Sequence, residues 1–279
     1  MAKTIMIQGT ASGVGKTTIA LALCRIFRQD GYKVAPFKAQ NMTANTYLSE
    51  KGEEIAVSQY LQAVAAGIPP SADMNPILLK PLPDQQGAQV IVRGKLFEMV
   101  DFYNFKDLRK AFAPKIADAY SRLCSEYEVI VMEGAGSPVE LNLNRDDIVN
   151  MGMAKRAGAP VILVADIDRG GVFASLYGTL NLLCESERAY VKAVVVNGFR
   201  GEACLFKDGV AILEEITGLP VAGVVPYTDI DLPEEDSLFD HDSTPRLGAD
   251  FESQFNTVAN AVRKALDMEL IYKILDEGI

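Results

Sequence analysis

The chain has 279 residues, 27 of them basic and 37 acidic, which gives a formal net charge of −10. This length suffices for one large domain or two modest ones, each with a hydrophobic core. The acidic balance argues against broad binding of nucleic acids or anionic membranes, because it repels phosphate groups. His241 is the only histidine. A single histidine argues against Ser-His and Cys-His catalytic pairs and against metal sites built from several histidines.

The sequence predicts a cytoplasmic protein. The first residues turn polar after Ile7, which is not typical of a signal peptide. No apolar run reaches the ~18 residues that a membrane span requires. The four cysteines are widely separated and form no CxxC pair, so we expect neither a zinc site nor an iron–sulfur site.

Short apolar runs rich in β-branched residues alternate with segments of helical period. The runs lack polar alternation, as strands do when both faces of a parallel sheet are covered. The predicted strands are Thr4–Gln8, Lys33–Phe37, Val129–Met132, Pro160–Ala165, Ala193–Asn197 and Val221–Val225. The predicted helices are Thr17–Asp30, Glu54–Ala66, Leu108–Glu126, Asp147–Ala157, Phe173–Leu183 and Gly209–Thr217. This order predicts a doubly wound, mostly parallel α/β sheet that binds ligands at the carboxyl ends of its strands.

The composition changes near the C-terminus. Residues 229–250 are acidic and contain proline and glycine, which is typical of a linker. Apolar residues then recur at helical spacing and predict a helix over Phe251–Leu275. We therefore expect a main domain over residues 1–237, an acidic linker over 238–250 and a helical tail over 251–279.

A glycine-rich loop follows the first predicted strand and leads into a helix. Its sequence, Gly-Thr-Ala-Ser-Gly-Val-Gly-Lys-Thr-Thr, begins at Gly9. Backbone N–H groups of such a loop cradle phosphates, the lysine reaches the β- and γ-phosphates, and the next hydroxyl ligates Mg²⁺. Thr10 stands where the usual pattern has its first glycine. The residues expected to bind the nucleotide here are Thr10, Ser12, Gly13, Val14, Gly15, Lys16, Thr17 and Thr18.

This variant loop resembles that of dethiobiotin synthetase and its relatives, which include amide synthases of the cobalamin pathway. Other motifs narrow the resemblance: Pro36–Met42, Met74–Pro81, Gln89–Val92, Glu133–Pro138, Asp147–Met151, Asp166–Ala174, Asn197–Gly201 and Leu232–Ser237. Together they closely resemble the synthetase domain of the cobyric acid synthase family, over about residues 3–238.

The resemblance implies a P-loop NTPase fold of the dethiobiotin synthetase-like type. It also implies a ligase that uses ATP and Mg²⁺ to amidate carboxylates in cobalamin biosynthesis. The implied substrate is a corrinoid, adenosylcobyrinic acid a,c-diamide, whose b, d, e and g side chains become amides through acyl phosphates to give cobyric acid. Such chemistry requires positive charge around the transferred phosphoryl group.

The resemblance also assigns roles to single side chains. Lys16 and Lys38 are expected to act on the phosphoryl group, with Lys38 placed like the second active-site lysine of dethiobiotin synthetase. Glu133 ends a buried strand and is expected to be catalytic and to bind the metal. Thr17 and Glu54 complete the expected magnesium ligands, since hard oxygen donors suit this ion.

Further residues are expected at the nucleotide base and at the substrate. Asn197 resembles an asparagine that reads adenine, and Pro226 lies in a loop expected to cover the base. A polycarboxylate corrinoid requires amide donors and cations. The candidates on its side are Gln40, Asn41, Asn45, Asn75, Lys80, Arg93, Asp168, Arg169 and Arg200.

Members of this family usually carry a glutaminase domain with a cysteine nucleophile and a histidine, and neither feature is visible in this sequence. Residues 256–276 resemble the tail that closes the full-length protein. The chain is therefore expected to use free ammonia or ammonia from a separate glutaminase subunit. Similarity to dethiobiotin synthetase is compatible with a homodimer, and no nucleic acid or membrane partner is expected.

Three alternatives stay open from the sequence. One is another carboxylate-activating ATPase such as dethiobiotin synthetase, against which the motifs at Pro36–Met42 and Asp166–Ala174 argue. A second is a ParA- or MinD-like ATPase switch, although such proteins typically carry an additional early lysine where Ala11 and Ser12 stand. A third is a non-catalytic remnant.

Overall fold

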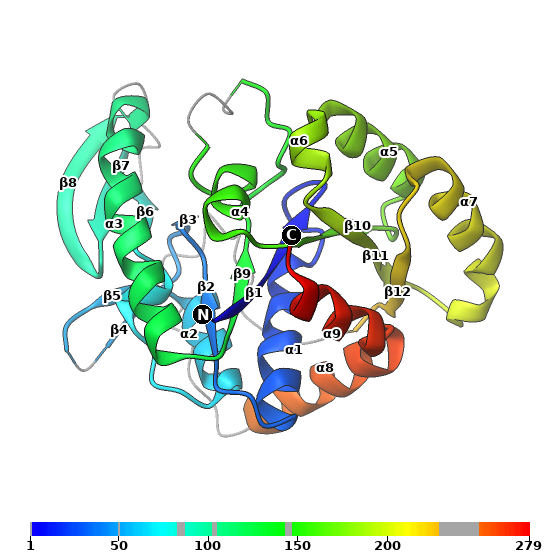
Figure 1. The fold of residues 1–279 in the computed structure, drawn as a ribbon. Coiled ribbons are helices and arrows are strands. Elements are labelled where there is room, and N and C mark those ends of the chain that lie inside the picture. The colour runs from blue at the N-terminus through cyan, green and yellow to red at the C-terminus, as the bar shows by residue number, and fades with distance from the viewer. Residues whose placement is uncertain (1, 50, 83–86, 102–104, 143–146, 229–250) are drawn as a thin grey trace.

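A six-stranded parallel sheet forms the centre of the computed structural model, which describes residues 2–49, 51–82, 87–101, 105–142, 147–228 and 251–279 (Figure 1). The strand order is β12-β11-β10-β1-β9-β2. The strands are β1 (Lys3–Gly9), β2 (Val34–Phe37), β9 (Val129–Glu133), β10 (Val161–Asp166), β11 (Val191–Phe199) and β12 (Val221–Pro226). Each of the six predicted strands is present, and the doubly wound parallel α/β fold is confirmed.

The position of β1 determines where the site forms. This first strand lies between β9 and β10, so the chain runs outward from it in both directions. A reversal of strand order of this kind opens a crevice at the carboxyl ends of the strands. Ile7 pairs with Glu133, Gly9 with Val164, and Asp166 with Asn197. The register therefore brings the phosphate loop, Glu133 and Asn197 to one edge of the sheet.

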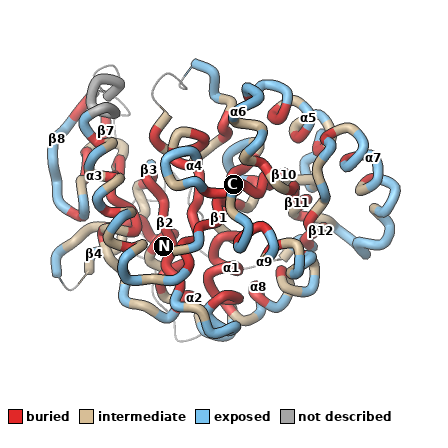
Figure 2. The backbone as a smooth tube through the Cα atoms, viewed as in Figure 1, coloured by how far each residue is buried: buried red, intermediate tan, exposed pale blue. Residues whose placement is uncertain are grey.

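Helices cover both faces of this sheet. Ile5 and Ile7 of β1 join a core with α1 (Lys16–Gln29), α2 (Val57–Ala66) and the C-terminal helices. Met6 points to the opposite core, with α3 (Phe105–Glu126), α4 (Met151–Ala157), α5 (Val172–Leu182) and α7 (Lys207–Thr217). The strands between these layers are almost entirely buried (Figure 2). Two buried faces explain why their sequences lack polar alternation.

A second sheet lies beside β2 and was not predicted. Its order is β3-β6-β7-β8, with β3 (Gln40–Met42), β6 (Ile77–Pro81), β7 (Gly87–Val92) and β8 (Lys95–Asp101). Arg93 and Gly94, with φ of 50° and 74°, form the two-residue turn between β7 and β8. Positive φ at both turn positions suits the right-handed twist of a hairpin.

Two predicted helices begin later in the structure than the sequence predicts. Glu54–Ala56 forms strand β5, which pairs with β4 (Thr46–Leu48), and α2 begins only at Val57. The Asp147 carboxylate accepts the N–H groups of Val149, Asn150 and Gly152, so regular helix begins only at Met151. Side-chain acceptors of this kind compete with helical backbone bonds.

The C-terminal helix is also divided in two. Its parts are α8 (Phe251–Ala265) and α9 (Met268–Glu277). Between them, the Asp267 N–H donates to the Ala222 carbonyl of β12 at 2.7 Å, and the Asp267 side chain caps α9 through the Leu270 N–H. Because the Asp267 N–H donates to the edge strand β12, it forms no hydrogen bond within a continuous helix, and the helix is interrupted here.

The C-terminal helices pack against α1, which carries the phosphate loop at its start. Arg25 donates to Asn256 and pairs with Glu252, and Arg263 pairs with Asp30 at 2.8 Å. The two chain ends also meet, because Lys3 pairs with Asp276 at 2.7 Å. The expected linker, residues 238–250, lies outside the described residues, so the domain division remains a prediction.

Within the part of the chain that the structure describes, no helix combines the length and apolar character needed to cross a membrane.

We predict that the C-terminal helices contribute directly to the stability of the main domain. Phe255 is 0% exposed in the core beneath α1. Phe255→Ala should lower the free energy of unfolding by about 3–5 kcal/mol, because it removes buried apolar surface and leaves a cavity. Urea denaturation measures this difference. The control Leu205→Ala, at a residue 77% exposed, should change stability by less than about 0.5 kcal/mol.

Candidate functional site

The phosphate loop connects the end of β1 to α1 and is shaped by close approaches of its backbone. A Cβ atom on Gly9 would lie 2.5 Å from Val14 Cγ2 and 2.9 Å from the Lys16 side chain. Gly15 has a φ of 96°, and a Cβ there would lie 2.1 Å from Asn197 Nδ2. Both positions therefore require glycine.

The loop residues at the start of α1 differ in burial and in hydrogen bonding. Ser12 and Gly13 are exposed, whereas Val14 is buried and anchors the loop in the core. Thr10 extends the sheet, since its N–H donates to the Val164 carbonyl at 2.9 Å. Lys16 is only 6% exposed, and its Nζ donates to the Ala11 carbonyl at 2.8 Å. That ammonium thus lies over the loop, at the positive end of the helix dipole.

The Glu133 carboxylate lies at the centre of a buried polar cluster next to this loop. Its Oε1 accepts hydrogen bonds from Thr17 Oγ1 and Lys38 Nζ, each at 2.8 Å. Its Oε2 accepts a hydrogen bond from Gln62 Nε2 at 2.7 Å. Glu133 is 1% exposed and Lys38 is 2% exposed. Ion pairs this deep stabilise a protein only when further hydrogen bonds accompany them, and here both oxygens of the carboxylate accept at least one.

Neighbouring elements hold the Lys38 backbone in place. Lys38 follows β2 directly, and its N–H donates to the Met74 carbonyl at 2.8 Å. Asn75 Nδ2 donates to the Lys38 carbonyl at 3.2 Å and to the Ile77 carbonyl at 3.0 Å. The segment that begins the second sheet therefore positions the lysine.

Two of the three predicted magnesium ligands come together. The Thr17 hydroxyl and the Glu133 carboxylate are hard oxygen donors in mutual contact, and they fit an ion that keeps several waters and phosphate ligands. Among the described residues, no group of three or more His, Cys, Asp and Glu side chains could hold a metal by itself. The donor set therefore suits Mg²⁺ bound together with a nucleotide.

The third predicted ligand, Glu54, is placed with other partners. It lies on β5, where its Oε1 accepts hydrogen bonds from Lys80 Nζ at 2.7 Å and Thr46 Oγ1 at 2.6 Å. The prediction rested on a resemblance of residues 52–59 to the dethiobiotin synthetase segment that carries a metal-binding aspartate, and the structure has Glu54 in a strand. In this structure Glu54 is the ion-pair partner of Lys80.

The predicted adenine residue Asn197 packs against the phosphate loop. Its Nδ2 donates to the Val14 carbonyl at 3.1 Å. Arg200 lies over the Tyr227 ring, 3.8 Å from its centroid, next to the exposed Pro226. Arg200 Nη2 also donates to Asp168 at 3.0 Å, and hydrogen bonds from Arg200 hold the pKa of the Asp168 carboxyl below its usual value. These residues lie at or just after the carboxyl ends of β10, β11 and β12, at the sheet edge that carries the loop.

The predicted substrate residues fall into groups with different surroundings. Asn41 is buried and donates to Ser58 and Gln59, and Asn75 holds the Lys38 backbone. Arg93 lies in the β7–β8 turn and pairs with Asp73 at 2.9 Å. The remaining candidates are at least partly exposed, and they are Gln40, Asn45, Lys80, Asp168, Arg169 and Arg200.

Two polar residues next to the site, Gln62 and Asn150, are not among the predicted site residues. Asn150 holds the segment after β9, accepting from the Ala135 N–H at 3.0 Å and donating to the Ala135 carbonyl at 2.7 Å. A Cβ on Gly134 would lie 2.2 Å from Asn150 Oδ1. Asn150 belongs to Asp147–Met151, one of the motifs that carry the resemblance. The local sequence does not distinguish Gln62, because Ser58 and Gln59 on the same helix face are also polar.

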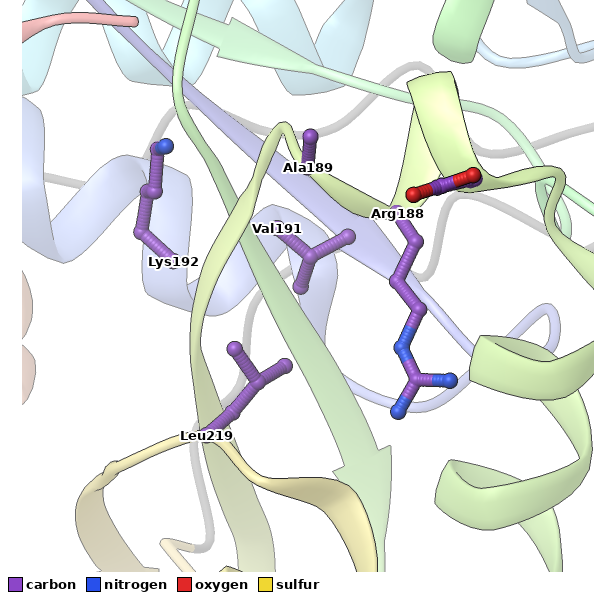
Figure 3. Close-up of a pocket in the computed structure, with 6 residues that line it drawn as sticks. Arg188, Ala189, Val191, Lys192 and Leu219 are labelled. Atoms are coloured by element: carbon purple, nitrogen blue, oxygen red, sulfur yellow. The ribbon is translucent and has the colours of Figure 1, made fainter.

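A separate hollow of about 430 Å³ lies at the opposite end of β11 (Figure 3). It is lined by Glu185, Arg188, Ala189, Val191, Lys192 and Leu219. Val191 is the first residue of β11, whereas the phosphate loop lies at the carboxyl ends of the strands. This hollow is therefore distinct from the polar cluster around Glu133.

Comparison with known proteins identifies the family. Residues 5–239 match the CobQ/CobB/MinD/ParA nucleotide binding domain. The chain belongs to this family. It is 54% identical over 242 residues to the cobyric acid synthase of Lachnoclostridium phytofermentans, an alignment covering 85% of this chain and 47% of that protein. It is 50% identical over 238 residues to the cobyric acid synthase of Streptococcus sanguinis, covering 85% and 48%.

The resemblance to cobyric acid synthases that the motifs predicted is thereby confirmed, and the phosphate loop belongs to a nucleotide-binding domain. The chain spans about half the length of these curated relatives. Among solved structures, a ParA family ATPase from Chlorobium tepidum has a TM-score of 0.51 at 13% identity. That alignment covers 99% of this chain and 96% of the ATPase, and it supports the fold alone.

We predict that the phosphate loop of this chain tolerates no side chain at Gly9. Gly9→Ala should weaken nucleotide binding at least about 10-fold, because the new methyl group displaces Val14 and Lys16. Isothermal titration with a non-hydrolysable ATP analogue measures the effect. The control Gly178→Ala, inside α5 with no atom within 4 Å of the added Cβ, should leave affinity unchanged. It should also raise stability by about 0.5–1 kcal/mol.

We predict that Asp73 contributes to the stability of the fold and that this contribution depends on pH. Burial raises the pKa of Asp73, but hydrogen bonds and charges from Arg122 and Arg93 outweigh it and hold that pKa below the ordinary 3.8. A lowered folded-state pKa stabilises the fold above the unfolded-state pKa, and this stabilisation is lost as the pH falls through the folded value. Asp73→Asn should therefore cost about 2 kcal/mol at neutral pH and progressively less below about pH 4.

Urea denaturation at several pH values measures the Asp73 effect. The exposed control Glu215→Gln should cost little at any pH. A constant penalty for Asp73→Asn from pH 7 to pH 3 would contradict the assignment.

Proposed function

We propose that this chain is the ATP-dependent, amide-forming part of a cobyric acid synthase in cobalamin biosynthesis. The observation that carries the proposal is the buried Glu133 cluster with Thr17 and Lys38 at the phosphate loop. A nucleotide-binding domain that is 54% identical to half of a cobyric acid synthase supports the choice of substrate. The proposed substrate is adenosylcobyrinic acid a,c-diamide.

The proposed chemistry solves a specific problem, because a carboxylate is a poor electrophile with a poor leaving group. A carboxylate oxygen attacks the γ-phosphorus of ATP, the bond to the β–γ bridging oxygen breaks, and ADP leaves. Ammonia then attacks the acyl carbon, and inorganic phosphate departs with the former carboxylate oxygen while the nitrogen loses a proton. Each cycle converts one carboxylate to an amide and one ATP to ADP and phosphate.

The chain's own residues supply positioning and charge. Phosphoryl transfer depends on aligning the two anions and on neutralising the equatorial oxygens. Lys16, at the loop, is suited to the β- and γ-phosphates, and Lys38 is suited to the γ-phosphate or the attacking carboxylate. Thr17 and Glu133 would hold Mg²⁺, which supplies further charge neutralisation when bound.

The nucleotide base and the corrinoid would occupy neighbouring parts of the crevice. Asn197 and Pro226 are proposed for adenine, in keeping with their place beside the loop. The exposed Arg169 and Arg200 are suited to bind carboxylates of the corrinoid. We propose ammonia as the nitrogen donor, either free or delivered by a separate glutaminase, so the test supplies ammonium directly.

We predict amide formation by the chain with ATP, Mg²⁺, ammonium and the a,c-diamide. Mass spectrometry should show stepwise conversion of carboxylates to amides, with ADP formed in proportion. Lys38→Met should lower kcat at least about 100-fold, because it removes a cation from the phosphoryl-transfer site. The exposed ion pair of Lys155 with Glu187 provides the control, and Lys155→Met should keep full activity.

ATP hydrolysis that proceeds equally without corrinoid, with no amide product, would contradict this function and favour an ATPase switch. Equal amidation rates for Lys38→Met and the unmodified chain would contradict the role of Lys38. Nucleotide affinity and far-UV circular dichroism of each variant separate these outcomes from loss of fold.

A further inference from the structure

Gln62 is a fully buried polar residue on a helix that is otherwise mostly apolar. It is 0% exposed in α2, whose sequence is VSQYLQAVAA. Burying an amide costs free energy unless its N–H and carbonyl groups are hydrogen-bonded. An apolar side chain would satisfy the core at this position, so a specific interaction must account for the amide.

That interaction is with the Glu133 carboxylate. Gln62 Nε2 donates to Glu133 Oε2 at 2.7 Å. The opposite orientation of the amide would place its carbonyl against a carboxylate oxygen, so the chemistry dictates which atom faces Glu133. Gln62 Oε1 is then buried without a hydrogen-bond partner among the described residues.

The two oxygens of Glu133 therefore have different partners. Oε1 faces Thr17 and Lys38, the residues proposed for magnesium and for phosphoryl transfer. Oε2 accepts the hydrogen bond from Gln62, on α2. A donor on Oε2 fixes the plane of the carboxylate and directs Oε1 toward the phosphate loop.

An uncharged side chain suits position 62, next to the Glu133 carboxylate. A lysine there would compete with a bound cation for the carboxylate, and a glutamate would add negative charge next to the phosphates. A neutral amide orients Glu133 and leaves its full negative charge available to the metal. Groups that hydrogen-bond a metal's carboxylate ligand in this way tune both its orientation and its affinity.

We propose that Gln62 is the positioning residue for the metal ligand Glu133, and that its unpaired Oε1 accepts a hydrogen bond from a water in the hydration shell of the bound Mg²⁺. The inference rests on the Mg²⁺-nucleotide chemistry of the proposed function. Mg²⁺ usually keeps several waters, each of which needs acceptors in a closed site. Gln62 would thus hold the metal site through both ends of one amide.

Metal affinity, measured apart from turnover, tests the inference. Mn²⁺ is titrated by electron paramagnetic resonance into the full chain with a non-hydrolysable ATP analogue. Gln62→Met keeps the side-chain volume and removes both polar atoms, and it should weaken Mn²⁺ binding about 10–100-fold. Metal-free nucleotide affinity should stay within about 2-fold. In the amidation assay, the variant should need correspondingly more Mg²⁺ for half-maximal rate and recover kcat at saturation.

The matched control is Gln59→Met. Gln59 lies on the same helix, is 1% exposed, and accepts from Asn41 and Ser58 instead of contacting Glu133 through its hydrogen bonds. It should lose comparable stability but bind Mn²⁺ within about 2-fold of the unmodified chain. If Gln62→Met does not fold, Gln62→Asn keeps an amide that is one methylene too short, and it should show the same weakening.

Unchanged Mn²⁺ affinity in Gln62→Met, or equal weakening in Gln59→Met, would overturn the inference. So would an unmodified chain that binds no Mn²⁺ with the nucleotide. A chain that binds Mn²⁺ and nucleotide but forms no amide would overturn the proposed function alone, because the metal titration would still decide the role of Gln62.

Discussion

The buried carboxylate of Glu133 is the constraint on which the site depends. A carboxylate removed from water must recover its lost hydration from cations and hydrogen-bond donors. Those donors come from the start of α1 (Thr17), the residue after β2 (Lys38) and the middle of α2 (Gln62). Satisfying one carboxylate therefore holds two helices and two neighbouring strands in a single relative arrangement around the phosphate loop.

The strand order makes this convergence possible. Because β1 lies between β9 and β10, the loop after β1 lies where the order of strands reverses, which is where folds of this kind bind ligands. The same crowding leaves no room for side chains at Gly9, Gly15 and Gly134, where an added Cβ would lie within 2.5 Å of a neighbouring side chain. The backbone is therefore tightly packed around the buried Glu133 carboxylate. This is expected, because a buried charge needs close partners that are held in place.

Peripheral elements stabilise the same centre from two sides. The second sheet begins immediately after Lys38, and Asn75 ties the lysine backbone to the start of β6. On the other side of the molecule, α8 covers α1 through Phe255 and the ion pairs of Arg25 and Arg263. Neither element carries the phosphate loop, but each fixes an element that presents a residue of the cluster.

The sequence by itself determined the parallel core and the main site positions. Continuous apolar runs mark strands buried on both faces, and residues just beyond strand ends, such as Lys38 and Glu133, must reach the same edge. Only the tertiary structure decided the second sheet, because its short strands are stabilised by pairing with distant segments. It likewise decided that Glu54 pairs with Lys80 and that Gln62 holds Glu133. A buried glutamine has the same local sequence signature as a surface one, and only the fold supplies its partner.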